Sequence, residues 1–269
     1  TPATYSMVSK EFGEKIAALI DGVTKIDQFR FESQEARQAE TYRKMLLSVT
    51  RDIRVILIKF ADRLHNMRTL GHISTDQQQR IARETLEVYA PLAHRFGLAR
   101  IRGELEDLSL KHLDFESYQT IRENVAMKRA EREAYLEEFK DPIEEELRRN
   151  GIEAEITARA KRFYSIYTKM SSREKSFEEI YDLMAVRILF GTVRECYQTL
   201  GLVHTLYRPI PDRFKDYIAT PKSNMYQSLH TSVIGPRGLP VEIQMRTQEM
   251  HHTAEIGIAA HWRYKTGTQ

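Results

Sequence analysis

A carboxylate, an amide and a guanidinium follow one another at every second position near the end of the chain. Glu242, Gln244 and Arg246 alternate with apolar residues over residues 241–247, the period-two pattern of a half-buried strand. Such a strand presents the three polar groups in a row, about 7 Å apart. Carboxylates suit Mg²⁺ and guanidinium groups suit phosphates. This segment alone also fits an ordinary solvated sheet face.

Cations gather at a predicted strand–helix junction in the same half of the chain. A strand is expected over 153–160, and a short helix over 163–170. Positions 165 and 169 are one helical turn apart, so their side chains share a face. Several donors around one junction suit the charge of a triphosphate. The polar residues concerned are Arg159, Lys161, Arg162, Ser165 and Lys169.

A second carboxylate stands at the start of another predicted strand. Asp182 opens the Val-, Ile- and Leu-rich segment 183–190, and Arg187 lies five residues further on. Together with Glu242, Asp182 would supply the paired carboxylates that a magnesium–nucleotide site requires. No glycine-rich phosphate loop of the Walker or Rossmann kind occurs in the sequence.

An aromatic residue among hydrogen-bonding groups follows a proline-framed loop at 209–221. Tyr226 and His230 lie four residues apart, after Lys222 and Asn224. An exposed tyrosine near lysine, asparagine and histidine side chains could stack on a nucleotide base. A half-buried packing role for Tyr226 is equally compatible with the segment.

The overall composition is that of a globular protein. The chain has 269 residues, 41% apolar and 29% charged, with a net charge of +3 and one cysteine. No apolar run approaches the roughly 18 residues of a membrane span, and a single cysteine excludes a disulfide framework. We therefore expect a cytoplasmic protein that is not a membrane protein. The mildly positive net charge is compatible with polyanionic ligands, but it does not by itself indicate binding to nucleic acid.

Helical periodicity dominates the first half of the chain. Helices are expected over 9–20 (ending before Gly22), 34–49, 54–68, 76–94 (kinked at Pro91), 101–113 and 116–150. The helix over 54–68 is apolar around most of its circumference, which predicts a central position. The stretch 128–149 is dense in charge and carries only a thin apolar line, so it is expected to be an exposed connector.

The pattern changes after Asn150 and Gly151, where strands begin to alternate with helices. Besides the three strands above, a strand is expected over 229–234, and helices over 193–207 and 248–264. A capping box is expected at Ser176 and Glu179. The predicted fold class is α+β: a helical domain at 1–113, a helical connector at 114–150, and a mixed α/β domain at 151–269.

The predicted central helix carries polar residues that could do chemistry. Asp62 and Asn66 are one turn apart and share a face. A carboxylate on a nearly buried helix is costly unless it is paired or bound to a metal. An ion pair with Arg63 or Arg68 is the simplest expectation.

Five ordered segments of the second half resemble the synthetase core of the long RelA/SpoT homologues: 181–188, 213–219, 222–230, 241–247 and 254–262. The segment 60–70 resembles the later motif of their HD hydrolase domain. The resemblance implies an HD-type helical domain followed by a nucleotidyltransferase-like synthetase domain. It also implies transfer of the β,γ-pyrophosphate of ATP to the 3′-hydroxyl of GDP or GTP, which gives (p)ppGpp and AMP.

Specific roles follow from the matched motifs. Asp182 and Glu242 resemble the Mg²⁺ ligands, with Glu242 as the activator of the 3′-hydroxyl. Arg159 and Arg187 match the arginines that sandwich adenine, although Arg162 stands where the family commonly has histidine. The remaining ATP residues would be Lys161, Ser165 and Lys169, and the GDP or GTP residues would be Arg213, Lys215, Lys222, Asn224, Tyr226, His230 and Gln244.

The HD-like segment implies a remnant of a second site. Asp62 resembles the last ligand of a catalytic Mn²⁺, and Asn66 and Thr69 would line the alarmone pocket. The family's earlier ligands lie upstream of the position that matches Thr1, so we expect a piece of a longer protein. That parent would be a Mn²⁺-dependent (p)ppGpp hydrolase, whereas this chain would not hydrolyse ppGpp. Ribosome binding would likewise require regions outside this sequence.

Two non-catalytic readings remain open at this point. One is a silent module that senses guanine nucleotides or alarmones, and the other is an RNA-binding protein. The predicted pair of Asp182 and Glu242 argues against both, because a pure binding protein does not need two metal-binding carboxylates.

Overall fold

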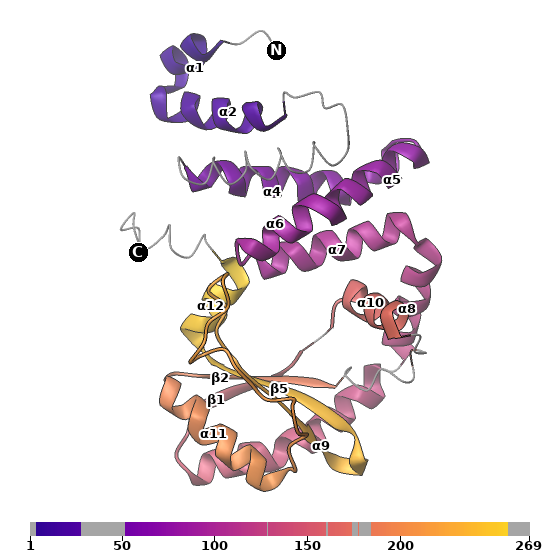
Figure 1. Cartoon of the computed structure of the whole chain (residues 1–269), viewed down its shortest axis with the longest axis vertical. Helices are drawn as coiled ribbons and strands as arrows, with labels where there is room; N and C mark the ends of the chain where they lie inside the picture. The colour runs from indigo at the N-terminus through magenta and orange to yellow at the C-terminus, as the bar shows by residue number, and fades with distance from the viewer. Residues whose placement is uncertain are drawn as a thin grey trace.

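The computed structural model describes residues 4–27, 52–127, 129–159, 161–173, 177 and 184–257. The predicted helix at 34–49, the capping box at Ser176, the carboxylate of Asp182 and the chain after Gly257 lie outside these residues. Within them, stacked helices occupy one end of the molecule and a sheet flanked by helices occupies the other (Figure 1). Helix α7 (Ala99–Leu113) lies between the two ends.

The helical end has its own apolar core, built from α4 to α7. Phe60 lies at its centre, with edge-to-face ring contacts to Tyr89 and Phe96. The elements at this end are α1 (Tyr5–Phe12), α2 (Glu14–Asp27), α4 (Ile53–Arg68), α5 (Thr75–Glu84) and α6 (Ala90–Arg95). Among the described residues, no helix is long and apolar enough to cross a membrane.

The prediction of one helix over 9–20 that ends before Gly22 is wrong. Gly13 separates α1 from α2 with a φ of 84°, a backbone conformation that glycine adopts without strain. Gly22 instead lies inside α2, where Val55 of α4 packs closely against its backbone. A side chain at position 22 would meet Val55, so glycine here allows a close helix contact rather than a helix end.

Helix α4 is only partly surrounded by other residues. Val55, Ile56, Phe60 and Met67 are buried, but Ile58 is 43% exposed. The prediction of a helix buried on nearly all sides is therefore too strong. The apolar residues on one face are enough to anchor α4 in the helical core.

A widened turn joins α5 to α6. Residues 85–89 form a π-helical turn, in which the N–H of Ala90 donates to the carbonyl of Thr85. Pro91 follows and has no N–H to donate, so the regular hydrogen-bond ladder is interrupted at this point. The predicted irregularity at Pro91 is confirmed, and it takes the form of a π turn.

The helical connector predicted at 114–150, with its exposed stretch at 128–149, forms two helices with different surroundings. Helix α8 (Phe115–Met127) packs on α7 and α10. Helix α9 (Arg129–Arg149) buries Leu136, Phe139 and Ile143 in the core beneath the sheet. The prediction of an exposed connector is wrong for α9, because its thin apolar line is the part that faces the sheet.

A five-stranded sheet organises the other end of the molecule, in the order β1-β2-β5-β4-β3. Strands β2 and β5 are parallel, and the other pairs are antiparallel. The strands are β1 (Ala154–Ala158), β2 (Ala185–Phe190), β3 (Lys215–Asp216), β4 (Leu229–Ile234) and β5 (Pro240–Thr247). The predicted mixed sheet is confirmed.

The two faces of the sheet differ in chemistry, as the alternation in β5 predicts. Val241, Ile243 and Met245 are buried against α9 and α11 (Val193–Leu206) on the apolar face. Glu242, Gln244 and Arg246 point to the opposite face, toward α7, α10 (Phe163–Arg173) and α12 (Gln248–Ile256). Figure 1 shows α9 and α11 on one side of the sheet and α7, α8 and α10 on the other.

Candidate active site

One polar row crosses all five strands on the face opposite α9 and α11. Strand register places Thr157, Arg187, Gln244, His230 and Lys215 side by side. Cross-strand partners point to the same face, so residues far apart in the sequence meet there. Gln244 at the centre of the row is buried, so this is a covered surface and not the ordinary solvated face that the β5 pattern also allowed.

Glu242 neighbours this row and is surrounded by donors. Gln244 Nε2 donates to Glu242 Oε1 at 2.8 Å, Arg159 Nη1 lies 3.6 Å from Oε1, and Lys161 Nζ lies 3.9 Å from Oε2. Burial raises the pKa of Glu242, but the Gln244 hydrogen bond and the charges of Lys161 and Arg159 outweigh it, so the pKa lies below its ordinary value. The carboxylate is therefore ionised at neutral pH.

Two arginines lie at the edge of the site near α12. Arg187 Nη1 and Arg246 Nη2 are 3.8 and 3.9 Å from Glu255 Oε1, and Arg246 is only 2% exposed. Burial lowers the pKa of Arg187, and it lowers the pKa of Arg246 to about 10. The buried Nε atoms of both find no hydrogen-bond partner among the described residues, which marks a place where a polar ligand could bind.

An aromatic cluster forms the other side of the site. The Tyr226 hydroxyl lies 2.7 Å from His230 Nε2, and Tyr217 contacts both rings edge to face. Lys222 Nζ lies 4.4 Å from the Tyr217 ring centre and 5.3 Å from that of Tyr226. Burial, together with the nearby cations, lowers the pKa of His230 to about 4 despite the opposing charge of Glu242. His230 is therefore neutral at pH 7.

Two cavities open on this face and share a wall. The larger, of about 620 Å³, is lined by Arg159, Lys161, Arg187 and Arg246 and falls within the usual range for ligand pockets. The smaller, of about 270 Å³, is lined by Lys222, Asn224, His230 and residues of α7. Both cavities include Ala99, Arg159, Arg162, Tyr226, Gln244 and Ala254 in their walls.

The helical end of the molecule completes the smaller cavity. Asn224 Nδ2 donates to the carbonyl of His94 at 3.0 Å, and Tyr164 N donates to Asp107 Oδ1 at 2.9 Å. Arg162 pairs with Asp107 at 3.7 Å and lies against Gly103, where a side chain would collide with it. Contacts of Asp107 and Gly103 with Arg162 and Tyr164 therefore hold helix α7 over the polar face of the sheet.

Most of the predicted site residues are brought together. Arg159, Lys161, Arg187, Tyr226 and Gln244 line the larger cavity, whereas Ser165, Lys222, Asn224 and His230 line the smaller one. Glu242 lines neither cavity but accepts a hydrogen bond from Gln244, which lines both. Lys169, Arg213 and Lys215 line neither cavity, and Asp182 lies outside the described residues.

Several residues of the site were not predicted. Arg102 and Glu106 come from α7, and Glu255 comes from the helix that follows β5. The i,i+4 spacing of Arg102 and Glu106 is visible in the sequence, but it is typical of any solvated helix face. Only the packing of α7 over the sheet distinguishes this pair.

The donor chemistry fits a magnesium ion at Glu242. The ionised carboxylate is a hard oxygen ligand beside a cavity rich in cations, as expected for a site that handles Mg²⁺ and phosphates. The predicted second carboxylate is Asp182, which lies outside the described residues.

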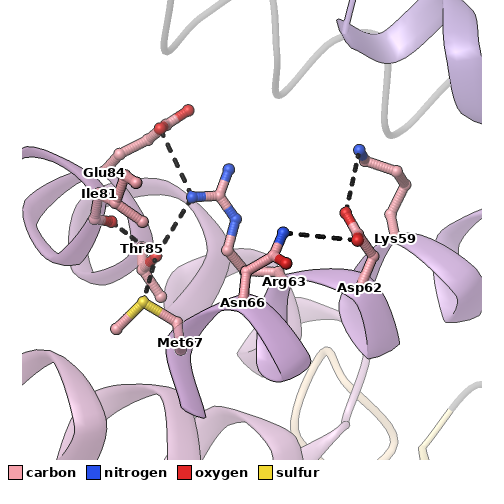
Figure 2. Close-up of polar contacts among 8 residues, drawn as sticks. All are labelled: Lys59, Asp62, Arg63, Asn66, Met67, Ile81, Glu84 and Thr85. Carbon is pink, nitrogen blue, oxygen red and sulfur yellow. Dashed lines mark hydrogen bonds and ion pairs between the residues drawn. The ribbon is translucent and has the colours of Figure 1, made fainter. Parts of the chain in front are cut away.

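Asp62, the residue predicted as a manganese ligand, is paired with residues of its own helix (Figure 2). Its side chain is 54% exposed and pairs with Lys59 at 3.8 Å, and Asn66 Nδ2 donates to Oδ1 at 3.4 Å. The expected ion pair with Arg63 or Arg68 is wrong. Arg63 turns to Glu84 at 3.5 Å and Thr85 at 3.4 Å, as Figure 2 shows, and Arg68 pairs with Glu104.

The described residues near Asp62 do not fit a catalytic manganese ion. No group of three His, Cys, Asp or Glu side chains that could hold a metal occurs in the described part of the chain. Thr69 ends α4 and donates from Oγ1 to the carbonyl of His65 at 3.0 Å. No hydrolytic step can be derived from Asp62, Asn66 and Thr69 alone.

Two family models match the chain. Residues 2–99 match an HD domain, and residues 158–269 match the region found in RelA / SpoT proteins. The second match contains strands β2 to β5 and the residues that they place on the polar face. A solved small alarmone synthetase 1 from Bacillus subtilis with bound pppGpp is 25% identical, covering 56% of this chain and 84% of that one, with a TM-score of 0.39.

Curated relatives match almost the whole chain. It is 53% identical over 98% of its length to a probable guanosine-3′,5′-bis(diphosphate) 3′-pyrophosphohydrolase of Synechocystis sp.. It is 49% identical to a GTP pyrophosphokinase of Myxococcus xanthus over 99% of its length, and to the bifunctional (p)ppGpp synthase/hydrolase SpoT of Escherichia coli over 98%. The chain spans 35%, 36% and 38% of these relatives, respectively. It therefore belongs to the RelA/SpoT family and joins an HD domain to the RelA/SpoT region.

Proposed function

We propose that the chain transfers the β,γ-pyrophosphate of ATP to the 3′-hydroxyl of GDP or GTP, giving (p)ppGpp and AMP. In this reaction the 3′-oxygen forms a bond to the β-phosphorus, and the bond between that phosphorus and the oxygen bridging it to the α-phosphorus breaks. AMP leaves with the bridging oxygen, and the hydroxyl proton is released. The reaction needs two nucleotides held side by side.

The observation that carries this proposal is the pair of adjoining cavities on one sheet face. Arg159, Tyr226 and Gln244 contribute to both walls, so ligands in the two cavities would lie next to each other. Glu242 is hydrogen-bonded to Gln244 and close to Arg159. A two-substrate transfer requires such a shared boundary, whereas a sensor of one nucleotide needs a single cavity.

The larger cavity suits the ATP. Arg159, Lys161, Arg187 and Arg246 supply positive charge along its walls, which favours a triphosphate. The flat guanidinium groups of Arg159 and Arg187 could also stack on the adenine ring. The buried Nε of Arg187 has no hydrogen-bond partner among the described residues, so it can donate to the ligand.

The smaller cavity suits the guanine nucleotide. Tyr226 offers a ring for the base to stack on, and its hydroxyl is held by His230. Lys222 lies beside this ring and can bind a phosphate. Asn224 is tied to α6 through the carbonyl of His94, which fixes the acceptor loop.

Glu242 is the proposed catalytic residue. Its lowered pKa keeps it ionised, so it can accept a hydrogen bond from the 3′-hydroxyl and help to remove the proton. Glu242 and Asp182 would hold Mg²⁺, which neutralises charge on the phosphates when bound. Arg159 and Lys161 stabilise the negative charge that builds up during transfer.

The printed names of the relatives support this activity. The Myxococcus xanthus protein is a GTP pyrophosphokinase, and the Escherichia coli protein is both a synthase and a hydrolase of (p)ppGpp. Because the chain spans less than two-fifths of either relative, the activity has to be tested on the chain itself.

The test is to incubate the purified chain with ATP, GDP and MgCl₂ and to separate the nucleotides. We expect AMP and ppGpp in equal amounts. Glu242→Gln should lower the rate at least about a hundredfold, because it removes the negative charge and keeps the shape. Glu249→Gln, an exposed position on α12, is the matched control and should leave the rate unchanged.

Two results would contradict the proposal. One is nucleotide binding without AMP formation, which would favour a sensing module. The other is a Glu242→Gln variant that makes product at the rate of the unaltered chain, which would move the catalytic role to another residue. Binding of RNA in preference to either nucleotide would support the remaining alternative.

A further inference from the structure

One face of helix α7 forms part of the wall of the smaller cavity. Ala99, Arg102, Gly103 and Glu106 all line it, and their spacing places them on one side of the helix. This face lies opposite Lys222, Tyr226 and His230. A residue of the helical end of the molecule can therefore contact a ligand that binds on the sheet.

Glu106 differs from the other charged residues in this wall. Among the described residues that line the smaller cavity, Glu106 is the one carboxylate, whereas Arg102, Arg159, Arg162 and Lys222 are cations. Its side chain is 9% exposed, and Arg102 Nε donates to its Oε1 at 2.7 Å. No other hydrogen bond to Glu106 occurs among the residues that the structure describes. One carboxylate oxygen therefore remains available to a ligand.

A buried carboxylate needs donors, because its desolvation is costly. It would repel the phosphates of a nucleotide, which the cations of the same cavity attract. The remaining donors of a nucleotide are the ribose hydroxyls and the base, and the proposed reaction directs the 3′-hydroxyl toward Glu242. Guanine carries two adjacent donors, N1–H and the 2-amino group, and a carboxylate can accept hydrogen bonds from both. Adenine offers no such pair.

We propose that Glu106 accepts hydrogen bonds from N1–H and the 2-amino group of guanine while Tyr226 stacks on the ring, which makes Glu106 a specificity-determining residue. Arg102 is a positioning residue that orients the carboxylate. This inference rests on the proposed function, because it assumes that the acceptor nucleotide occupies the smaller cavity. It assigns base selection at the sheet to a side chain of α7, in the helical end of the molecule.

Base analogues of the acceptor test the role of Glu106. Inosine diphosphate lacks the 2-amino group, and xanthosine diphosphate has a carbonyl in its place. The unaltered chain should use GDP at least about tenfold better than inosine diphosphate, by kcat/KM. In Glu106→Gln the preference for GDP over inosine diphosphate should fall to within about threefold. The KM for ATP should not change.

The same variant should gain a new acceptor. The side-chain amide that Glu106→Gln introduces can donate its N–H to the 2-carbonyl of xanthine, so use of xanthosine diphosphate should rise several-fold. A merely structural role would lower kcat/KM for all three acceptors equally. Glu104→Gln is the matched control, because Glu104 lies on the same helix and pairs with Arg68 away from the cavity.

Equilibrium binding separates this inference from the proposed function. Dissociation constants for GDP and inosine diphosphate are measured with the unaltered chain, Glu106→Gln, Glu106→Asp and Glu104→Gln. If no variant forms AMP but GDP selectivity depends on Glu106, the proposed function fails and this inference stands. If synthesis occurs and Glu106→Gln keeps the full preference for GDP, this inference is overturned and the proposed function stands. If Glu106→Gln does not fold, Glu106→Asp decides, and unchanged selectivity there overturns the inference.

Discussion

At the scale of single residues, neutral and cationic partners surround the ionised carboxylate of Glu242. Gln244 donates to Glu242 while Arg159 and Lys161 stand within 4 Å, so the carboxylate stays charged although it is largely enclosed. His230 is kept neutral in the same surroundings. The residue types and their strand alternation are visible in the sequence, but these pairings are not.

Tyr226 is predicted to act through its ring. Tyr226→Ala should raise the KM for GDP by roughly tenfold to a hundredfold, because stacking of a base on an aromatic ring is worth about 1–3 kcal/mol. Tyr226→Phe keeps the ring, loses the contact with His230, and should stay within about threefold. Steady-state kinetics with each substrate varied in turn measures both effects. An equal rise in the KM for ATP in Tyr226→Ala would contradict a stacking role for the acceptor.

His230 should make the fold sensitive to acid. Its pKa of about 4 in the folded state lies below the ordinary value near 6.5, so the unfolded chain binds the proton first as the pH falls. The stability contributed by the neutral side chain is complete above pH 6.5 and is lost as the pH falls from 6.5 toward 4. Between pH 7.5 and 5, this loss should be about 1–2 kcal/mol.

Urea unfolding at the two pH values measures this loss. His230→Gln cannot titrate, so the free energy of unfolding of this variant should fall by about 1–2 kcal/mol less than that of the unaltered chain. The other titrating groups are common to both proteins and cancel in the comparison. An equal fall in both would show that His230 does not carry the acid sensitivity.

At the scale of secondary-structure elements, the contact between α12 and the turn that joins α6 to α7 fixes the smaller cavity. Gly257 ends α12 with a φ of 53°, and a side chain there would collide with the carbonyl of Phe96 and with Gly97. Gly97 in turn lies against the backbone of Asn224. Glycine at both positions allows the two halves of the chain to approach closely.

Gly257→Ala should therefore destabilise the protein. The added Cβ is strained by the backbone and blocked by Phe96, so the free energy of unfolding should fall by about 1–3 kcal/mol. The KM for GDP should also rise as the wall shifts. Gly201→Ala in α11 is the control, because nothing lies within 4 Å of the added Cβ, and it should be neutral or slightly stabilising. Equal stability of the two variants would contradict the tight contact.

The elements also show where sequence patterns succeed and where they fail. The alternation in β5 correctly predicts its two faces, because each face meets a different environment. The thin apolar line of α9 resembles that of a solvated helix, yet Phe139 and Ile143 are fully buried beneath the sheet. A narrow apolar stripe is enough to bury a helix when the stripe packs against a sheet. That packing depends on the tertiary structure, so the helix sequence alone does not reveal it.

At the scale of the whole molecule, the candidate site belongs to both halves of the chain. The sheet supplies Glu242, Gln244 and His230, while α6 and α7 supply His94, Arg102 and Glu106 to the smaller cavity. The family motifs predicted the residues on the sheet because those residues carry recognisable spacing. The residues of α7 lack such a signal, since their role depends on how α7 packs over the sheet.

The central claim is that the two adjoining cavities hold the two substrates, and a crystal structure of the chain with GDP, a non-hydrolysable ATP analogue and Mg²⁺ tests it most directly. The account predicts guanine against Tyr226 in the smaller cavity and the triphosphate against Arg159 and Lys161 in the larger one. It also predicts that the guanosine 3′-oxygen faces Glu242. Density for either nucleotide outside these cavities, or a 3′-oxygen turned away from Glu242, would contradict the account.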